Sequence, residues 1–129
     1  MKPAVFLFGE AERGDFCLPL HCKSLPQLAD SFGHPPQDSQ GIFYAIQSLL
    51  YQREIIFFRV REEGFSLADY QKGLKFLKEK NDVLPVSAIY LPGIGDLEII
   101  QETSSLCMKN KSLLVITEKD LYDYLTATF

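Results

Sequence analysis

Four short apolar runs recur along the chain, and the segments between them have helical periodicity. The runs cover residues 4–9, 54–60, 86–91 and 112–117. They are rich in β-branched or aromatic residues, which is typical of strands buried on both faces of a sheet. Strands that alternate with helices favour βαβ units and a parallel sheet. The sequence therefore predicts an α/β fold: a three-layer sandwich with a mostly parallel sheet of four or five strands, flavodoxin-like or Rossmann-like.

A fifth and weaker run, residues 16–22, contains Pro19. Proline has no backbone N–H to donate to a strand ladder. This run is therefore expected to be an edge strand, one arm of a hairpin, or a loop.

The helical segments carry start signals. Helices are expected over residues 39–52, 66–80, 96–109 and 117–129, with a short one beginning at residue 24. Asp96 is a suitable N-cap residue. Ser66 with Asp69, and Thr117 with Asp120, have the spacing of a capping box.

Length and composition predict one domain over residues 1–129. Hydrophobic residues make up 47% of the chain, the net charge is −4, and the pI is about 5.1. This acidic balance disfavours nucleic acid and anionic membrane surfaces as partners. The three cysteines do not form a disulfide framework, and the first residues do not resemble a signal peptide. We expect a cytoplasmic protein with no membrane partner.

Acidic residues gather where the predicted strands end. In open parallel sheets, ligands bind outside the carboxyl ends of the strands. The loop after the first run holds Glu10, Glu12 and Asp15, which are the candidate catalytic residues. Two carboxylates on neighbouring strand ends could hold Mg²⁺. A buried Glu in the first loop could act as a general acid or base if its pKa were raised. The other interpretation is an ordinary solvated turn.

The stretch "LPGIGDLE" invites comparison with phosphate-binding loops. It matches neither the dinucleotide fingerprint nor the P-loop, because Glu98 stands where a third glycine would be needed. We expect Gly93 and Gly95 to allow a tight turn into a helix that Asp96 caps. Gly93, Gly95, Asp96 and, after the last strand, Lys119 remain the candidate ligand-binding residues.

Two further constellations involve the cysteines. Cys17, His21, Cys22 and His34 could be zinc ligands, but their spacing matches no closed zinc site. A catalytic pair of Cys17 or Cys22 with His34 lacks any sign of an activated thiol. We therefore predict no metal site from these residues, and Cys107 is expected to be a core residue.

Length and strand spacing resemble receiver-type domains of the flavodoxin-like class. Such domains have acidic residues after the first strand and a lysine after the last, where this chain has Glu10 and Lys119. The acceptor aspartate is missing from residues 60–64, and a hydroxyl residue is missing from residues 91–93. The second strand is missing around residues 33–38. The resemblance implies an interaction module that is not phosphorylated.

Two functions follow as expectations. The first is a small cytoplasmic binding or regulatory module that acts through protein–protein contacts, with a partner or by self-association, and needs no cofactor. Tyr122, Tyr124 and Phe129 in the last helix are candidates for its surface. The alternative is a small hydrolase that uses carboxylates and Mg²⁺ at the carboxyl edge of the sheet.

Overall fold

The computed structural model describes residues 4–80 and 85–127. Phe129 lies outside the described residues. Strands and helices follow one another in the order β1 (Ala4–Gly9), β2 (Leu20–Cys22), α1 (Leu25–Phe32), α2 (Gly41–Leu50), β3 (Glu54–Arg59), α3 (Leu67–Lys80), β4 (Ala88–Tyr90), α4 (Leu97–Asn110), β5 (Leu113–Val115) and α5 (Glu118–Thr126).

The sheet has five strands in the order β2-β3-β1-β4-β5. Strand β1 is parallel to both β3 and β4, and β4 is parallel to β5. Strand β2 is antiparallel to β3, at the edge of the sheet, which is one of the places expected for the run containing Pro19. The predicted α/β fold with a mostly parallel sheet is confirmed.

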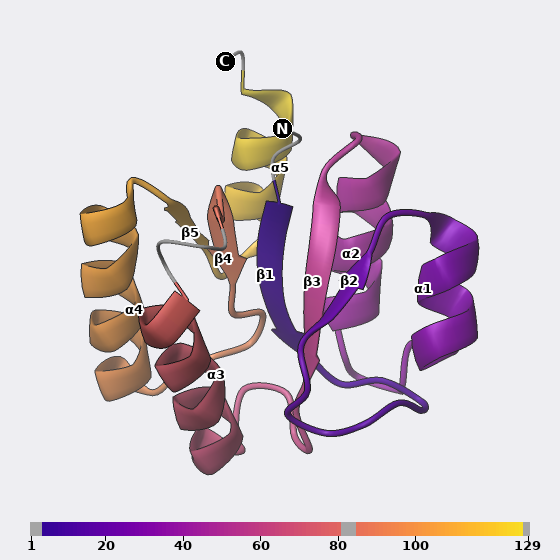
Figure 1. The fold of residues 1–129 in the computed structure, drawn as a ribbon, viewed down its shortest axis with the longest axis horizontal. Coiled ribbons are helices and arrows are strands. Elements are labelled where there is room, and N and C mark those ends of the chain that lie inside the picture. Colours follow the sequence, from indigo (N-terminus) through magenta and orange to yellow (C-terminus); the bar gives the residue numbers. More distant parts are fainter. Residues whose placement is uncertain (1–3, 81–84, 128–129) are drawn as a thin grey trace.

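Helices cover both faces of the sheet (Figure 1): α3 and α4 lie on one side, and α1, α2 and α5 on the other. Strand β1 is completely buried between them because its side chains serve both layers. Val5 and Leu7 join the core under α1, α2 and α5, while Phe6 and Phe8 join the core under α3 and α4. This division explains why the first apolar run has no polar face.

The place of β3 corrects one expectation. The resemblance to receiver-type domains predicted that residues 54–60 form the third strand and that the second strand is missing. In the structure, β3 lies next to β1 on the side away from β4, which is the place of the second strand in the flavodoxin-like order. The topological switch point therefore lies between β1 and β4.

Most of the expected helix starts are found. Thr117 and Asp120 form a capping box at α5, and Asp96 accepts a hydrogen bond from Ile99 N at 3.0 Å at α4. The capping box expected for Ser66 and Asp69 is wrong. The carboxylate of Asp69 instead accepts bonds from Arg61, while the Ser66 hydroxyl bonds to Glu62.

No helix within the described residues combines the length and the apolar character that crossing a membrane requires.

Candidate functional site

Two carboxylates meet at the carboxyl edge of the sheet. Glu10 follows β1, and Glu63 lies in the loop after β3. The Glu63 amide donates to Glu10 Oε2 at 2.9 Å, and the Glu10 amide donates to Glu63 Oε1 at 3.0 Å. Each side chain thus accepts from the backbone of the other residue, which ties the two loops together.

Glu63 also holds the first turn of α2. Its Oε2 accepts from Gln40 N at 2.6 Å, and its Oε1 accepts from Gly41 N at 3.0 Å. Gln40 is the N-cap of α2 but makes no capping bond with its own side chain. The distant carboxylate therefore satisfies amides that a local cap would otherwise satisfy, and its charge suits the helix N-terminus.

Close backbone packing surrounds this carboxylate. A Cβ at Gly41 would lie 2.8 Å from both Glu63 Oε1 and Gly9 Cα. Burial raises the pKa of Glu63, the amides of Gln40, Glu10 and Gly41 lower it, and the charge of Glu10 raises it further; the net direction is upward. The arrangement is a buried carboxylate that joins β1, β3 and α2.

The other two candidate catalytic residues lie elsewhere. Glu12 Oε1 accepts from His34 N at 3.2 Å, next to the end of α1, and lies 3.5 Å from Arg13 Nη1. Asp15 is exposed in the same loop. The structure therefore brings Glu10 together with Glu63, and does not bring Glu12 into that contact.

The candidate ligand loop forms a turn between β4 and α4. Gly93 has a φ of 77°, and its carbonyl oxygen packs against Gly64, where a Cβ would lie 2.5 Å away. Gly95 has open surroundings. Asp96 uses its carboxylate to cap α4. Gly93 and Asp96 have the structural roles that the sequence indicated, whereas nothing around Gly95 requires a glycine. Whether the loop also binds a ligand stays a prediction.

Lys119 is the last candidate from the sequence. It is exposed on α5, and its Nζ lies 2.8 Å from Asp123 Oδ2, one turn further along the helix. Such an exposed pair contributes little to stability.

A second cluster of charged groups lies on the α3 side of the sheet. Asp69 is buried, and its two oxygens accept from the Arg61 amide at 2.9 Å and from Arg61 Nη1 at 2.6 Å. Burial alone would raise the pKa of Asp69, but the bonds from Arg61 and Cys17 outweigh it and lower that pKa. The Phe16 ring stacks on Arg61, with 4.7 Å between the guanidinium carbon and the ring centroid.

The cysteine constellations do not come together as sites. His21 pairs with Glu54 at 2.7 Å, and Cys22 is buried in the core. Burial and Asp69 raise the pKa of the Cys17 thiol, which disfavours the reactive thiolate. Within the described ranges, no group of three or more His, Cys, Asp or Glu side chains is arranged to hold a metal ion.

A hollow lies between α2 and α5, on the other layer. This α2–α5 groove has a volume of about 510 Å³ and is lined by Gln40, Phe43, Tyr44, Gln47, Tyr51, Glu118, Leu121, Tyr122 and Leu125. Its floor consists of buried residues, chiefly Tyr44, Leu121 and Leu125. Phe43, Tyr51 and Tyr122 stand at its walls, with exposed fractions of 50%, 43% and 65%. Exposed aromatic walls over an apolar floor are typical of binding sites.

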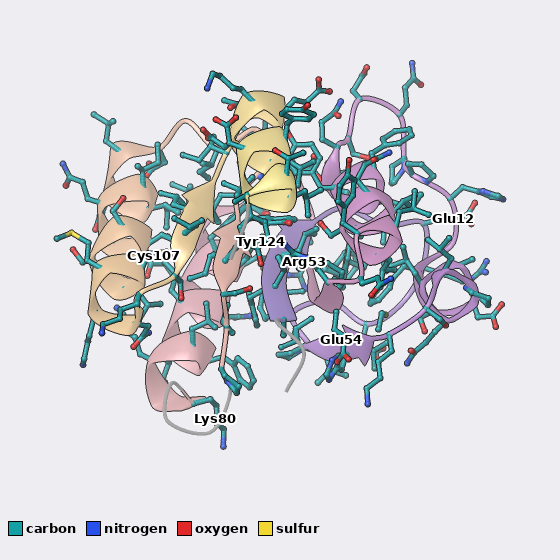
Figure 2. All side chains as sticks on the ribbon, turned by 90° about the horizontal axis from the view of Figure 1, so that it is seen from above. Glu12, Arg53, Glu54, Lys80, Cys107 and Tyr124 are labelled. Carbon is teal, nitrogen blue, oxygen red and sulfur yellow. The ribbon has the colours of Figure 1, made fainter. Side chains whose placement is uncertain are left out.

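The two ends of the groove differ. Glu118 and Gln40 lie where α5 and α2 begin, at the carboxyl edge of the sheet. Beyond the C-terminal end of α2, Arg53 lies over the ring of Tyr124, with 5.3 Å between its guanidinium carbon and the ring centroid (Figure 2). Figure 2 also shows Cys107 in the opposite layer, on α4, where it is buried as expected.

The fold and these geometries define a three-layer α/β protein with a buried carboxylate contact between the ends of β1 and β3 and an aromatic groove on one helical layer. No protein-family model, curated protein or solved structure matches this chain.

Sequence reasoning missed the groove and the Asp69–Arg61 pair. The signal for the groove was present in part, because residues 41–50 contain no charged side chain although some of them face solvent. The sequence held no signal for the pairing of Asp69 with Arg61, because the spacing of Asp69 from Ser66 indicated a helix cap instead.

Proposed function

We propose that this protein is a small binding or regulatory module that acts through protein–protein contacts, and that a segment of a partner polypeptide docks in the α2–α5 groove. The observation that carries the proposal is the set of exposed aromatic side chains, Phe43, Tyr51 and Tyr122, around an apolar floor. Aromatic residues are enriched in the cores of protein interfaces.

The dimensions of the groove suit a short segment. Helix α2, which forms one wall, has ten residues and is about 15 Å long. A groove of this length accepts about three turns of an amphipathic helix, or a few residues of extended chain, and both are recurring modes of peptide recognition.

Charge favours a partner over a second copy of this chain. The α5 wall carries Glu118, and Asp120 lies in the same turn. In a two-fold dimer the patch packs against the same patch of the second copy, so the interface would gather these carboxylates from both copies. A partner segment with apolar side chains and no acidic ones avoids this repulsion.

The cysteines support a cytoplasmic location, which we include in the proposal. Cys17, Cys22 and Cys107 are all free thiols. Intracellular proteins of reducing compartments typically keep their cysteines in this state.

The alternative function, a magnesium-dependent hydrolase at the carboxyl edge, has one observation in its favour: Glu10 and Glu63 lie in direct contact there. We place it second because both oxygens of Glu63 already accept bonds from backbone amides. A metal ion would have to displace donors that hold α2 in place.

A displayed library of random peptides, selected on the protein, tests the docking proposal. We expect selected peptides to bind the parent protein and to bind Phe43→Glu at least about tenfold more weakly, because a charge in the groove wall opposes apolar docking. The matched control is Met108→Glu, since Met108 is 83% exposed on α4, on the opposite face. This variant should bind like the parent.

Two results would contradict the proposal. One is a set of selected peptides that bind Phe43→Glu as tightly as the parent. The other is self-association of the parent in sedimentation, lost in Phe43→Glu, which would make a second copy the occupant of the groove.

A further inference from the structure

Among the described residues, the lining of the α2–α5 groove combines aromatic rings with one acidic side chain. Phe43, Tyr44, Tyr51 and Tyr122 supply the rings, and Glu118 supplies the carboxylate. Aromatic faces attract cations through their quadrupole, and a carboxylate attracts them through its charge. The lining therefore selects for a cation with an apolar body.

Glu118 is the acidic side chain that lines the groove. Among the described residues it forms no ion pair, while the neighbouring Lys119 is engaged with Asp123. Glu98 provides a useful comparison, because it stands in the first turn of α4 as Glu118 stands in the first turn of α5. Both charges suit a helix N-terminus, but Glu118 lines the hollow.

Several carboxylates act on the Tyr44 hydroxyl at the floor of the groove. Burial raises the pKa of the Tyr44 hydroxyl, and the charges of Glu118, Glu63 and Asp120 raise it further. Within the part of the chain that the structure describes, Glu63 and Asp120 accept hydrogen bonds from backbone amides and form no ion pair. Three carboxylates thus act on this end of the groove, against the positive N-terminal ends of α2 and α5.

The chain contains an example of the same recognition. Arg61 lies with its guanidinium carbon 4.7 Å from the Phe16 ring centroid while its Nη1 donates to Asp69 Oδ1 at 2.6 Å. A guanidinium can thus stack on an aromatic face and bond a carboxylate at once. Its planar group of donors suits this better than the ammonium of lysine does.

We propose that the α2–α5 groove binds an arginine side chain of the partner segment, with the guanidinium against the aromatic wall and bonded to Glu118. This inference rests on the proposed function and adds the chemistry of the anchoring residue. A guanidinium could come from a partner segment or from a free small molecule, so the test includes both sources.

Amide NMR titration of the full chain tests it with a blocked Leu-Arg-Leu tripeptide and its Leu-citrulline-Leu counterpart, in which the side chain keeps its shape and loses its charge. We expect the arginine peptide to shift amides of α2 and α5 and to bind about tenfold more tightly than the citrulline peptide. Glu118→Gln should lose this preference, and the control Glu98→Gln should keep it.

Equal binding of the two peptides, absence of binding at millimolar concentration, or equal effects of Glu118→Gln and Glu98→Gln would overturn the inference. Free arginine that binds as tightly as the peptide would overturn its assignment to a partner segment. Failure here is distinct from failure of the docking proposal. Selected peptides that need Phe43 but show no preference for arginine would support the docking proposal and contradict the inference of an arginine anchor.

Discussion

Glu10 and Glu63 each accept a hydrogen bond from the backbone amide of the other, at 2.9 Å and 3.0 Å. The exchange fastens the end of β1 to the loop after β3. Because Glu63 also accepts from Gln40 and Gly41, the same contact fixes the start of α2 and one end of the α2–α5 groove. The buried carboxylate therefore has a structural role that its position in an acidic loop did not indicate.

Replacing Glu63 by glutamine should destabilise the protein. The glutamine amide has one acceptor oxygen, so its NH₂ group must face at least one backbone N–H that Glu63 now satisfies. We expect a loss of about 1–3 kcal/mol, the usual cost of an unsatisfied buried polar group. Thermal unfolding measures it, with Glu62→Gln as the control because Glu62 is exposed. Equal melting temperatures of Glu63→Gln and the parent would show that the carboxylate does not hold α2.

Alanine at Gly41 should also be destabilising, whereas alanine at Gly95 should not. The new Cβ at Gly41 would lie 2.8 Å from Gly9 Cα, and backbone atoms cannot move aside as a flexible side chain can. At Gly95 a Cβ meets nothing within 4 Å, and the residue has no positive φ. We expect a lower melting temperature for Gly41→Ala, and for Gly95→Ala a change of less than about 1 kcal/mol in either direction. A destabilised Gly95→Ala would indicate a role for that glycine beyond the turn.

Stability should fall as the pH rises from about 4.5 through the folded-state pKa of Glu63. Burial raises that pKa above its ordinary value of 4.5, so the folded protein holds this proton more tightly than the unfolded chain does. The contribution of Glu63 to the free energy of unfolding is complete below its ordinary pKa and is lost above its folded-state pKa. Asp69 acts oppositely, because its pKa is lowered from 3.8 and its contribution is lost as the pH falls through the folded value.

Urea unfolding over a pH series, from about pH 4 to about pH 8, checks this prediction. The decline assigned to Glu63 should be absent from Glu63→Gln, which does not titrate. A parent and a variant with the same pH dependence would show that another group is responsible.

The architecture could be predicted from the sequence because a strand that is buried on both faces has a continuous run of apolar residues. The run over residues 4–9 is β1 without change, since all six of its residues are buried. The run over residues 112–117 overstated β5, which covers only Leu113–Val115 at the sheet edge. There the hydroxyl of Ser112 bonds to the carbonyl oxygen of Val86, and apolar character alone does not reveal where a ladder stops.

The candidate site was less predictable because its contacts join distant parts of the chain. Glu63 meets Glu10 only because β3 pairs with β1, and the sequence did not reveal that order. The groove depends on α2 lying beside α5, which no local pattern encodes. Asp96 was predictable as a cap, since the residue and the amide of Ile99 are three positions apart.

Magnesium should leave the melting temperature of the parent protein unchanged. A carboxylate pair at the carboxyl edge of the sheet offers the oxygen ligands that Mg²⁺ prefers. In this fold, however, Glu63 uses both oxygens to accept from backbone amides, and Glu10 uses Oε2 for the Glu63 amide. If Glu63 bound the ion, backbone amides in the first turn of α2 would lose their hydrogen-bond acceptor. That cost would oppose the free energy gained from coordination.

The measurement is a melting curve at increasing Mg²⁺ concentration, for the parent and for Glu10→Gln. A metal that binds the folded state stabilises it by an amount that grows with concentration, about 2.7 kcal/mol at a hundred times the dissociation constant. A rise of several degrees in the parent that disappears in Glu10→Gln would therefore favour the hydrolase over the interaction module. A rise that persists in Glu10→Gln would place a metal elsewhere on the protein and would leave the carboxylate contact in its structural role.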